Sequence, residues 1–173
     1  MNQRGIAIAA AGVMPFVLHA GSALAQVQES GRFLSLDLAM DAANEAVRVC
    51  REKGWPVSVS IVDATGKIKL QATGDFSASH TKDASFRKAY TTVAYASLFH
   101  FTKLSEWVAA LKTNPFASTY ATLPNIFLLP GAVAIKDGDE VIAAIGVGGA
   151  PGGDKDEMCA EAGLAKIKDR LTK

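Results

Sequence analysis

The fold of this chain is decided by Glu140-Val-Ile-Ala-Ala-Ile-Gly-Val147, which runs directly into Gly148-Gly-Ala-Pro-Gly-Gly153. The first stretch is almost wholly apolar, which predicts a buried strand. The second predicts a turn from this strand into a final helix. We expect Asp154 to cap that helix, with Glu157 three residues further on. The C-terminal third therefore predicts a strand, a Gly-rich turn and a helix.

The N-terminal part of the chain predicts a helix followed by a hairpin. Ser35 is a suitable cap for the helix, and Gly54 lies where it ends. Residues 57–62 and 67–72 alternate between apolar and polar side chains, as half-buried strands do. The turn signal at 63–66 lies between them, so the two strands are expected to pair antiparallel.

The middle of the chain predicts two helices and then further strands. Asp83–His100 has the spacing of a long helix, and a shorter helix is expected around Leu104–Leu111. Ile126–Leu129 and Ala132–Ile135 read as strands, and the second leads through a hairpin signal into the strand at 140–147. The predicted order is α-β-β-α-α-β-β-β-α. This is an α+β fold with a single antiparallel five-stranded sheet flanked by helices.

Composition excludes several classes of protein. With 173 residues, of which 49% are hydrophobic, the chain is long enough to bury a core and is not disordered. Two cysteines are too few for a disulfide scaffold. The formal net charge of +1 gives no electrostatic reason to bind nucleic acid. The body of the chain holds no apolar run long enough to predict a transmembrane segment.

The first 25 residues have the pattern of a cleavable signal peptide. Arg4 supplies a positive charge, residues 5–18 are mostly apolar, and Ala23-Leu-Ala25 is a small-x-small cleavage site. Residues 26–173 are then expected to form one mature domain. The sequence thus predicts a periplasmic or secreted protein.

The Gly-rich turn does not match a nucleotide-binding motif. Pro151 stands where a dinucleotide fingerprint has its third glycine, and Asp154 replaces the lysine of a phosphate-binding loop. Backbone N–H groups at Gly148 and Gly149 could still bind a small anion or carboxylate. A tight crossover that lets the helix approach the sheet is the other interpretation, and both stay open.

Two histidines and two cysteines remain as candidate functional residues. His80 lies in a polar loop before a helix, and His100 lies at the end of that helix. One histidine suffices for haem, because the porphyrin supplies four ligands. Cys50 and Cys159 either form a disulfide, as an exported protein permits, or are two buried thiols.

The sequence resembles the GlcG/HbpS family of haem-binding-type domains, which also occurs as the C-terminal domain of PduO-type corrinoid proteins. The most specific match is the stretch 144–163, similar to the family's G-V-S/G-G-A-P-G-G-x-x-D-x-x-C-A-x-A-G signature. Supporting matches are found at 38–46, 59–66, 88–93 and 129–131. The resemblance spans about residues 34–171.

This resemblance implies a profilin-like fold, an antiparallel five-stranded sheet, and homo-oligomers. Two segments depart from the family pattern, Ala72–Ser77 and Pro130–Ala134. Both are expected near the ligand groove. The resemblance therefore supports the predicted fold more strongly than the identity of the ligand.

The expected function is that of an exported haem-binding protein: a carrier, scavenger or sensor rather than an enzyme. Without a C-x-x-C-H motif the haem is expected to be b-type and non-covalent. His80 is the predicted iron ligand, and the predicted cofactor-binding set is completed by His100, Lys88, Gly148 and Gly149. The alternatives are an enzyme or accessory protein binding a small organic acid at the Gly-rich turn, and an interaction module without a ligand.

Overall fold

The computed structural model describes residues 31–171, and the predicted signal peptide lies outside them. None of the helices in this part of the chain is long and apolar enough to span a membrane. In chain order the elements are α1 (Leu36–Glu52), β1 (Ser58–Asp63), β2 (Ile68–Thr73), α2 (Thr81–Phe99), α3 (Leu104–Leu111), α4 (Ala117–Tyr120), β3 (Ala132–Asp137), β4 (Glu140–Gly148), α5 (Gly153–Ile167) and the 3₁₀ helix η1 (Lys168–Arg170).

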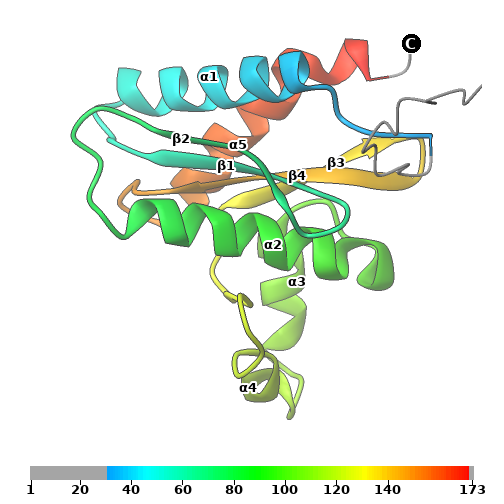
Figure 1. The fold of residues 1–173 in the computed structure, drawn as a ribbon. Coiled ribbons are helices and arrows are strands. Elements are labelled where there is room, and N and C mark those ends of the chain that lie inside the picture. The colour runs from blue at the N-terminus through cyan, green and yellow to red at the C-terminus, as the bar shows by residue number, and fades with distance from the viewer. Residues whose placement is uncertain (1–30, 172–173) are drawn as a thin grey trace, which may run out of the picture.

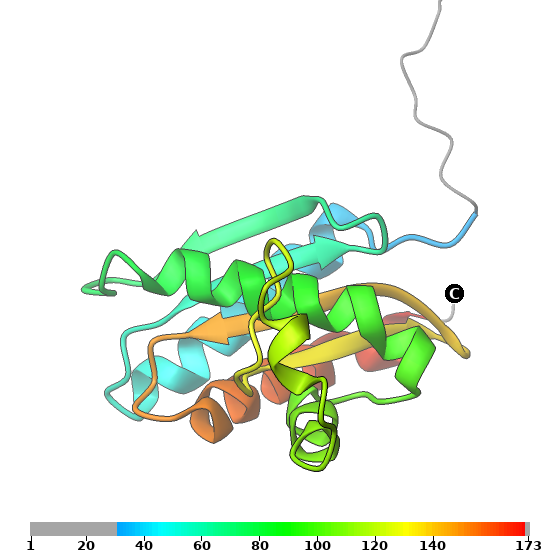
Figure 2. The same cartoon turned by 90° about the horizontal axis from the view of Figure 1, so that it is seen from below.

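A four-stranded antiparallel sheet forms the centre of the domain, with strand order β2-β1-β4-β3. The first residue of β1, Ser58, lies opposite Thr73 of β2 on one side and Gly148 of β4 on the other. Helices α1 and α5 lie side by side on one face, and α2 covers the other (Figures 1 and 2). This confirms an α+β fold with one antiparallel sheet flanked by helices.

The prediction of a fifth strand at 126–129 is wrong. The backbone of this segment bonds to α2 rather than to a strand: Arg87 Nη2 donates to the carbonyl of Ile126, and the N–H of Phe127 donates to Thr91 Oγ1, each at 2.8 Å. The Arg87 guanidinium also lies 4.8 Å from the centre of the Phe127 ring. Because these contacts satisfy backbone groups that a strand would pair, the apolar run packs without joining the sheet.

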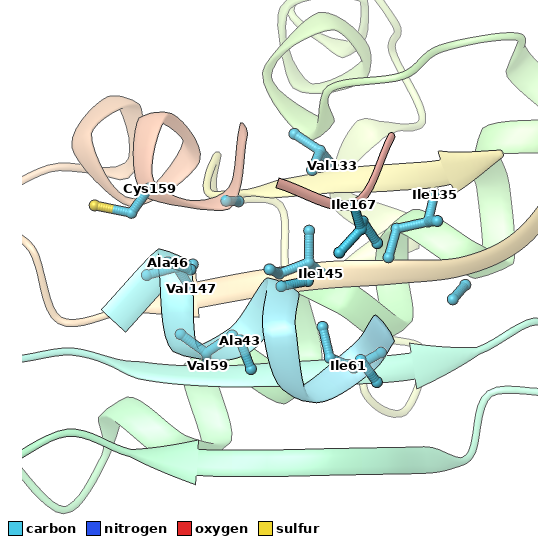
Figure 3. Packing of buried hydrophobic residues seen from close by; sticks show 14 of the residues in the cluster. Ala43, Ala46, Val59, Ile61, Val133, Ile135, Ile145, Val147, Cys159 and Ile167 are labelled. Carbon is cyan, nitrogen blue, oxygen red and sulfur yellow. The ribbon is translucent and has the colours of Figure 1, made fainter. Parts of the chain in front are cut away.

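Side chains on the central strands alternate between large and small, and this sets how close each helix lies. The side facing α1 and α5 carries the branched residues Val59, Ile61, Val133, Ile135, Ile145 and Val147 (Figure 3). The side facing α2 carries the small residues Ser58, Ser60, Ala132, Ala134, Ala144, Gly146 and Gly148. A Cβ on Gly146 would lie only 2.2 Å from the carbonyl oxygen of Ser85. The backbone of α2 therefore rests almost directly on β4.

A disulfide between Cys50 and Cys159 joins the two helices on the first face. Cys50 lies in the last turn of α1 and Cys159 in the first half of α5, and both are fully buried. Of the two possibilities that the sequence left open, a disulfide or two buried thiols, the structure has the disulfide. It fastens the end of α1 to the start of α5.

The sequence predicts the N-terminal cap of α1 correctly but not that of α5. Ser35 Oγ accepts from the N–H of Leu38 at 3.2 Å, as predicted for α1. The predicted cap of α5 is wrong, because the helix begins one residue before Asp154, after Gly152. Glu157 has another role: its carboxylate accepts from the N–H of Ser105 at 3.0 Å and from the Ser105 hydroxyl. It thereby ties α5 to α3.

Helices α3 and α4 project away from the sheet below α2 (Figure 1). Aromatic side chains hold this projection to the end of α2. The ring centres of Tyr95 and Trp107 lie 4.5 Å apart, and Tyr120 meets Trp107 edge-on at 5.4 Å. Burial raises the pKa of the Tyr95 hydroxyl, and the neighbouring Tyr120 adds to this effect. The cluster forms a second, smaller core.

Candidate functional site

The predicted site residues fall into three separate places along α2. His80 immediately precedes the helix and is exposed, and His100 follows its last residue and is exposed as well. A helix of 19 residues is about 28 Å long, so the two histidines lie at opposite ends. The structure therefore does not bring them together. His100 instead borders a small hollow of about 320 Å³ beside Trp107.

Gly148 and Gly149 lie at the His80 end of α2, packed against neighbouring backbone. A Cβ on Gly148 would lie 2.9 Å from the carbonyl oxygen of Thr81, which directly follows His80. A Cβ on Gly149 would lie 2.5 Å from the carbonyl oxygen of Pro56. Both glycines are needed for this close approach. These contacts support the interpretation of the turn as a tight crossover.

Lys88 lies in the middle of α2, and its side chain is buried in the interior. Its Nζ donates to Asp156 Oδ2 at 2.6 Å and to the carbonyl of Val147 at 3.1 Å, and the residue is 1% exposed. Burial raises the pKa of the Asp156 carboxyl, and the ammonium of Lys88 opposes that rise. The pair links α2, β4 and α5 across the edge of the sheet. Lys88, which was predicted to bind the cofactor, therefore already has a carboxylate and a carbonyl from its own chain as partners.

The Gly-rich turn already holds a carboxylate from its own chain. The N–H of Ala150 donates to Asp156 Oδ1 at 2.9 Å, and the N–H of Gly152 donates to the carbonyl of Ala150 at 2.8 Å. Asp154 adds a second carboxylate in the first turn of α5. A small organic acid at this turn would meet the Asp154 carboxylate, and the N–H groups of Ala150 and Gly152 already have acceptors.

A groove of about 810 Å³ lies at the same end of the domain as His80, on the face of α1. It runs between the second half of α1, the connection from α1 to β1, and the end of β2. This volume falls within the range of about 300–1,000 Å³ typical of pockets for cofactors and small ligands. The lining residues are Asn44, Val47, Arg48, Arg51, Gly54, Trp55, Pro56, Val57, Ala72, Thr73, Gly74, Asp75 and Phe76.

Two aromatic side chains border the groove from different segments. Trp55 is half-buried on the connection after α1, whereas Phe76, on the loop after β2, is 98% exposed. Phe76 also has a positive φ of 64°, which is uncommon for a bulky residue. Next to it, the hydroxyl of Ser77 is buried without a hydrogen-bond partner. Non-glycine residues in this backbone conformation cluster at active sites and ligand-binding segments.

Basic side chains surround Trp55. The Nζ atoms of Lys53 and Lys155 lie 5.9 and 5.6 Å from the centre of its ring. Arg51 lines the groove and, among residues 31–171, forms no ion pair. The edge of the groove at Trp55 is therefore suited to an anionic ligand with a flat apolar body.

Arg48 also lines the groove, but two carboxylates engage it. Its guanidinium bonds to Glu45 at 2.6 and 2.9 Å and to Glu52 at 2.5 Å. These bonds raise the pKa of Arg48, and the same contact lowers the pKa of Glu45. Arg48 thus contributes to the groove a cluster with one net negative charge rather than a free positive charge.

The sequence analysis expected the segment 72–77 near a ligand groove, and residues 72–76 do line this one, but it did not identify the walls from α1 and the connection to β1. Its walls come from α1, from the connection to β1 and from the end of β2, and these segments show no shared motif. A usable signal was present in Arg51-Glu-Lys-Gly-Trp55, where an aromatic residue lies among basic ones at the end of a helix. The structure shows that Gly74, Asp75 and Phe76 lie opposite this segment and complete the wall.

The architecture and this site define a small α+β domain with an open, partly basic groove. The sequence model of the family described as "Haem degrading protein HbpS-like" matches residues 34–165. The chain belongs to this HbpS-like, haem-related family. Among curated proteins, none matches it significantly.

Solved structures agree with this assignment. A crystal structure of HbpS is 31% identical, with a TM-score of 0.70, and the match covers 79% of this chain and 92% of that one. A double mutant of HbpS from Streptomyces reticuli is 32% identical, with a TM-score of 0.71 over 91% of this chain and 97% of that one. A complex of PduOC with haem shares the fold at 21% identity, with a TM-score of 0.69 over 78% and 95% of the two chains.

Proposed function

We propose that this protein binds haem non-covalently in the groove beside Trp55. The observation that carries the proposal is the groove itself, in a chain that belongs to a haem-related family. Its volume, its aromatic border and Arg51, which forms no ion pair within residues 31–171, suit a flat apolar ring that bears carboxylates. Haem, when bound, would supply the iron chemistry, and the chain would supply a hydrophobic surface and counter-charges.

The iron ligand has to come from outside the groove's lining, because the residues that line it include no histidine, cysteine, methionine or tyrosine. His80 is the candidate that the loop offers. It lies four residues after Phe76 on the same connection between β2 and α2, and it is exposed. We therefore keep His80 as the proposed axial ligand, and His100, at the far end of α2, as second.

We further propose that the protein is exported and acts as a carrier, scavenger or sensor in the periplasm or outside the cell, as a homo-oligomer. The signal-peptide pattern of residues 1–25 supports export. The Cys50–Cys159 disulfide supports an oxidising compartment, where such bonds persist. Exposed apolar side chains on the α3–α4 projection, such as Phe116, support self-association.

Titration of residues 26–173 with haemin tests the proposal. We expect a Soret band that saturates with the protein, and loss of that band in Ala72→Trp, which places a large side chain in the groove. Ala109→Trp, on the exposed surface of α3, is the matched control and should bind normally. Binding that is unaffected by Ala72→Trp would place the haem elsewhere, and absence of any Soret change would refute haem binding.

The same sample separates binding from degradation. With ascorbate and oxygen present, a bound haem that persists indicates a carrier or sensor, whereas loss of the Soret band without loss of protein indicates turnover. A thermal shift with small carboxylates, and none with haemin, would favour the organic-acid alternative at the Gly-rich turn.

A further inference from the structure

We propose that Arg51 is the anion-binding residue of the groove, and that it recognises a carboxylate on a planar aromatic ligand whether or not the ligand carries a metal. This inference rests on the proposed groove site and adds its chemical specificity. According to this inference, the groove binds the ring and the carboxylate of the ligand without needing a bond to iron.

The first step of the argument is the contrast between two arginines one turn apart on α1. Every guanidinium nitrogen of Arg48 donates to a carboxylate, through bonds to Glu45 and Glu52. The three side chains together carry one net negative charge. Arg51 borders the same groove and has no ion-pair partner within the described part of the chain. The guanidinium of Arg51 is therefore free to bind a ligand carboxylate. The Arg48 cluster, with its net negative charge, would repel one.

The second step is the position of the flat surface beside that charge. Trp55 lies four residues after Arg51, and the backbone N–H of Trp55 donates to the carbonyl of Cys50 at 3.0 Å. This bond, together with the neighbouring disulfide, fixes the connection that carries the ring against the end of α1. The ammonium groups of Lys53 and Lys155 next to the ring extend the positive edge. An aromatic ring and an anion-binding group are thus held at one place by rigid elements.

The third step concerns the metal. The groove's lining offers carboxylate, amide, guanidinium and apolar groups but none of the side chains that usually bind haem iron. Ring contact and carboxylate pairing would then supply affinity within the groove itself. A bond from His80 to iron would add to this affinity for haem without being required for a metal-free ring. The ligand class is a planar aromatic carboxylate, which includes the porphyrins.

The test is a titration of residues 26–173 with iron-free protoporphyrin IX and with its dimethyl ester, followed by quenching of tryptophan fluorescence. We expect the free acid to bind and the ester to bind at least tenfold more weakly. In Arg51→Gln the affinity for the acid should fall about ten- to hundredfold, the range of one charge-assisted hydrogen bond, while the affinity for the ester stays unchanged. Arg51→Lys should recover part of the loss.

Arg170→Gln is the matched control, because it also removes one exposed guanidinium but lies in η1, outside the groove. Circular dichroism and urea melts of each variant verify that the fold is retained. If Arg51→Gln weakens acid and ester equally, Arg51 acts through the structure of the groove and the inference is wrong.

The outcomes also separate this inference from the proposed function. If haemin binds and protoporphyrin does not, haem binding stands and metal-independent recognition is refuted. If protoporphyrin binds in an Arg51-dependent manner and haemin does not, the inference stands and the proposed function is refuted. If neither binds, both are refuted.

Discussion

Removal of the buried ammonium in Lys88→Met should destabilise the protein severely. Lys88 and Asp156 form a 2.6 Å ion pair with side chains only 2% and 5% exposed, so the remaining carboxylate would be left inside without its counter-charge. Breaking such a pair from one side costs about 3–5 kcal/mol. This is a large part of the roughly 5–15 kcal/mol by which a domain is stable.

Urea denaturation followed by circular dichroism measures this loss. With a slope of about 2 kcal/mol per molar urea, the midpoint of Lys88→Met should fall by about 1.5–2.5 M. The matched control is Arg170→Met, since Arg170 pairs with Asp41 at a similar 2.7 Å but on the surface. An exposed pair contributes about 0–1 kcal/mol, so this variant should shift the midpoint little. If the two variants lose equal stability, burial of the Lys88 pair is not what makes it important.

The loss of stability in Lys88→Met should depend on pH, and the direction of this dependence follows from the pKa of Asp156. Burial already raises the pKa of Asp156, and loss of Lys88 removes the charge that opposes this rise. A carboxyl group with a higher pKa in the folded than in the unfolded state binds protons better when folded. Its contribution to stability is present at low pH and is lost as the pH rises through the folded-state pKa. The deficit of Lys88→Met relative to the parent should therefore shrink as the pH is lowered from neutral.

The double variant Lys88→Met, Asp156→Leu removes both charges and should recover most of the stability. The same double variant decides whether Lys88 belongs to the ligand site. Haemin binding that survives in it would show that the buried pair is structural. Loss of binding in a stable double variant would support the sequence-based assignment of Lys88 to the cofactor.

Four further predictions can be tested separately. Reducing the disulfide, which closes a loop across 109 positions, should lower stability by up to about 4–5 kcal/mol in thermal melts, and a variant with alanine at both cysteines should show no response to reductant. Gly146→Ala should cost about 1–3 kcal/mol because its Cβ meets helix backbone, whereas Gly31→Ala, with no atom near its Cβ, should cost little in the same melts. His80→Ala should shift the Soret band of the haemin complex more than His100→Ala, and an unchanged spectrum in both would assign the iron to another side chain. The exported protein should have the mass of a chain that begins at Gln26, and a retained leader would refute cleavage.

The sequence predicts most of the fold because local signals agree with packing. Periodicity and capping at Ser35 place α1, and alternation places the first two strands of the sheet within a residue or two. The segment 126–129 misleads because an apolar run has the same appearance whether it pairs as a strand or packs on a helix. The side chains of Arg87 and Thr91 decide this outcome, and they lie more than 30 positions away in the chain.

The candidate site is predicted less well, for a different physical reason. His80 and the two glycines at 148–149 lie at the same end of the domain, and their role in ligand binding stays a prediction. The groove itself depends on how the end of β2 faces α1, and spacing along the chain carries no information on that contact. The difference between Arg48 and Arg51 could have been predicted from spacing on α1, because Glu45 and Glu52 lie three residues before and four residues after Arg48, whereas Arg51 has no acidic residue at such spacings.

The antiparallel arrangement of α1 and α5 has a practical consequence for joining this domain to other molecules. Asp41 meets Arg170 near the start of α1, whereas the groove borders the helix from Asn44 to its end. With α1 about 25 Å long, attachments before residue 31 or after residue 171 leave from the end of the helix pair remote from the groove. A fluorescent partner or a surface tether on either terminus should therefore leave the groove accessible, and tandem copies joined end to end should each bind ligand independently.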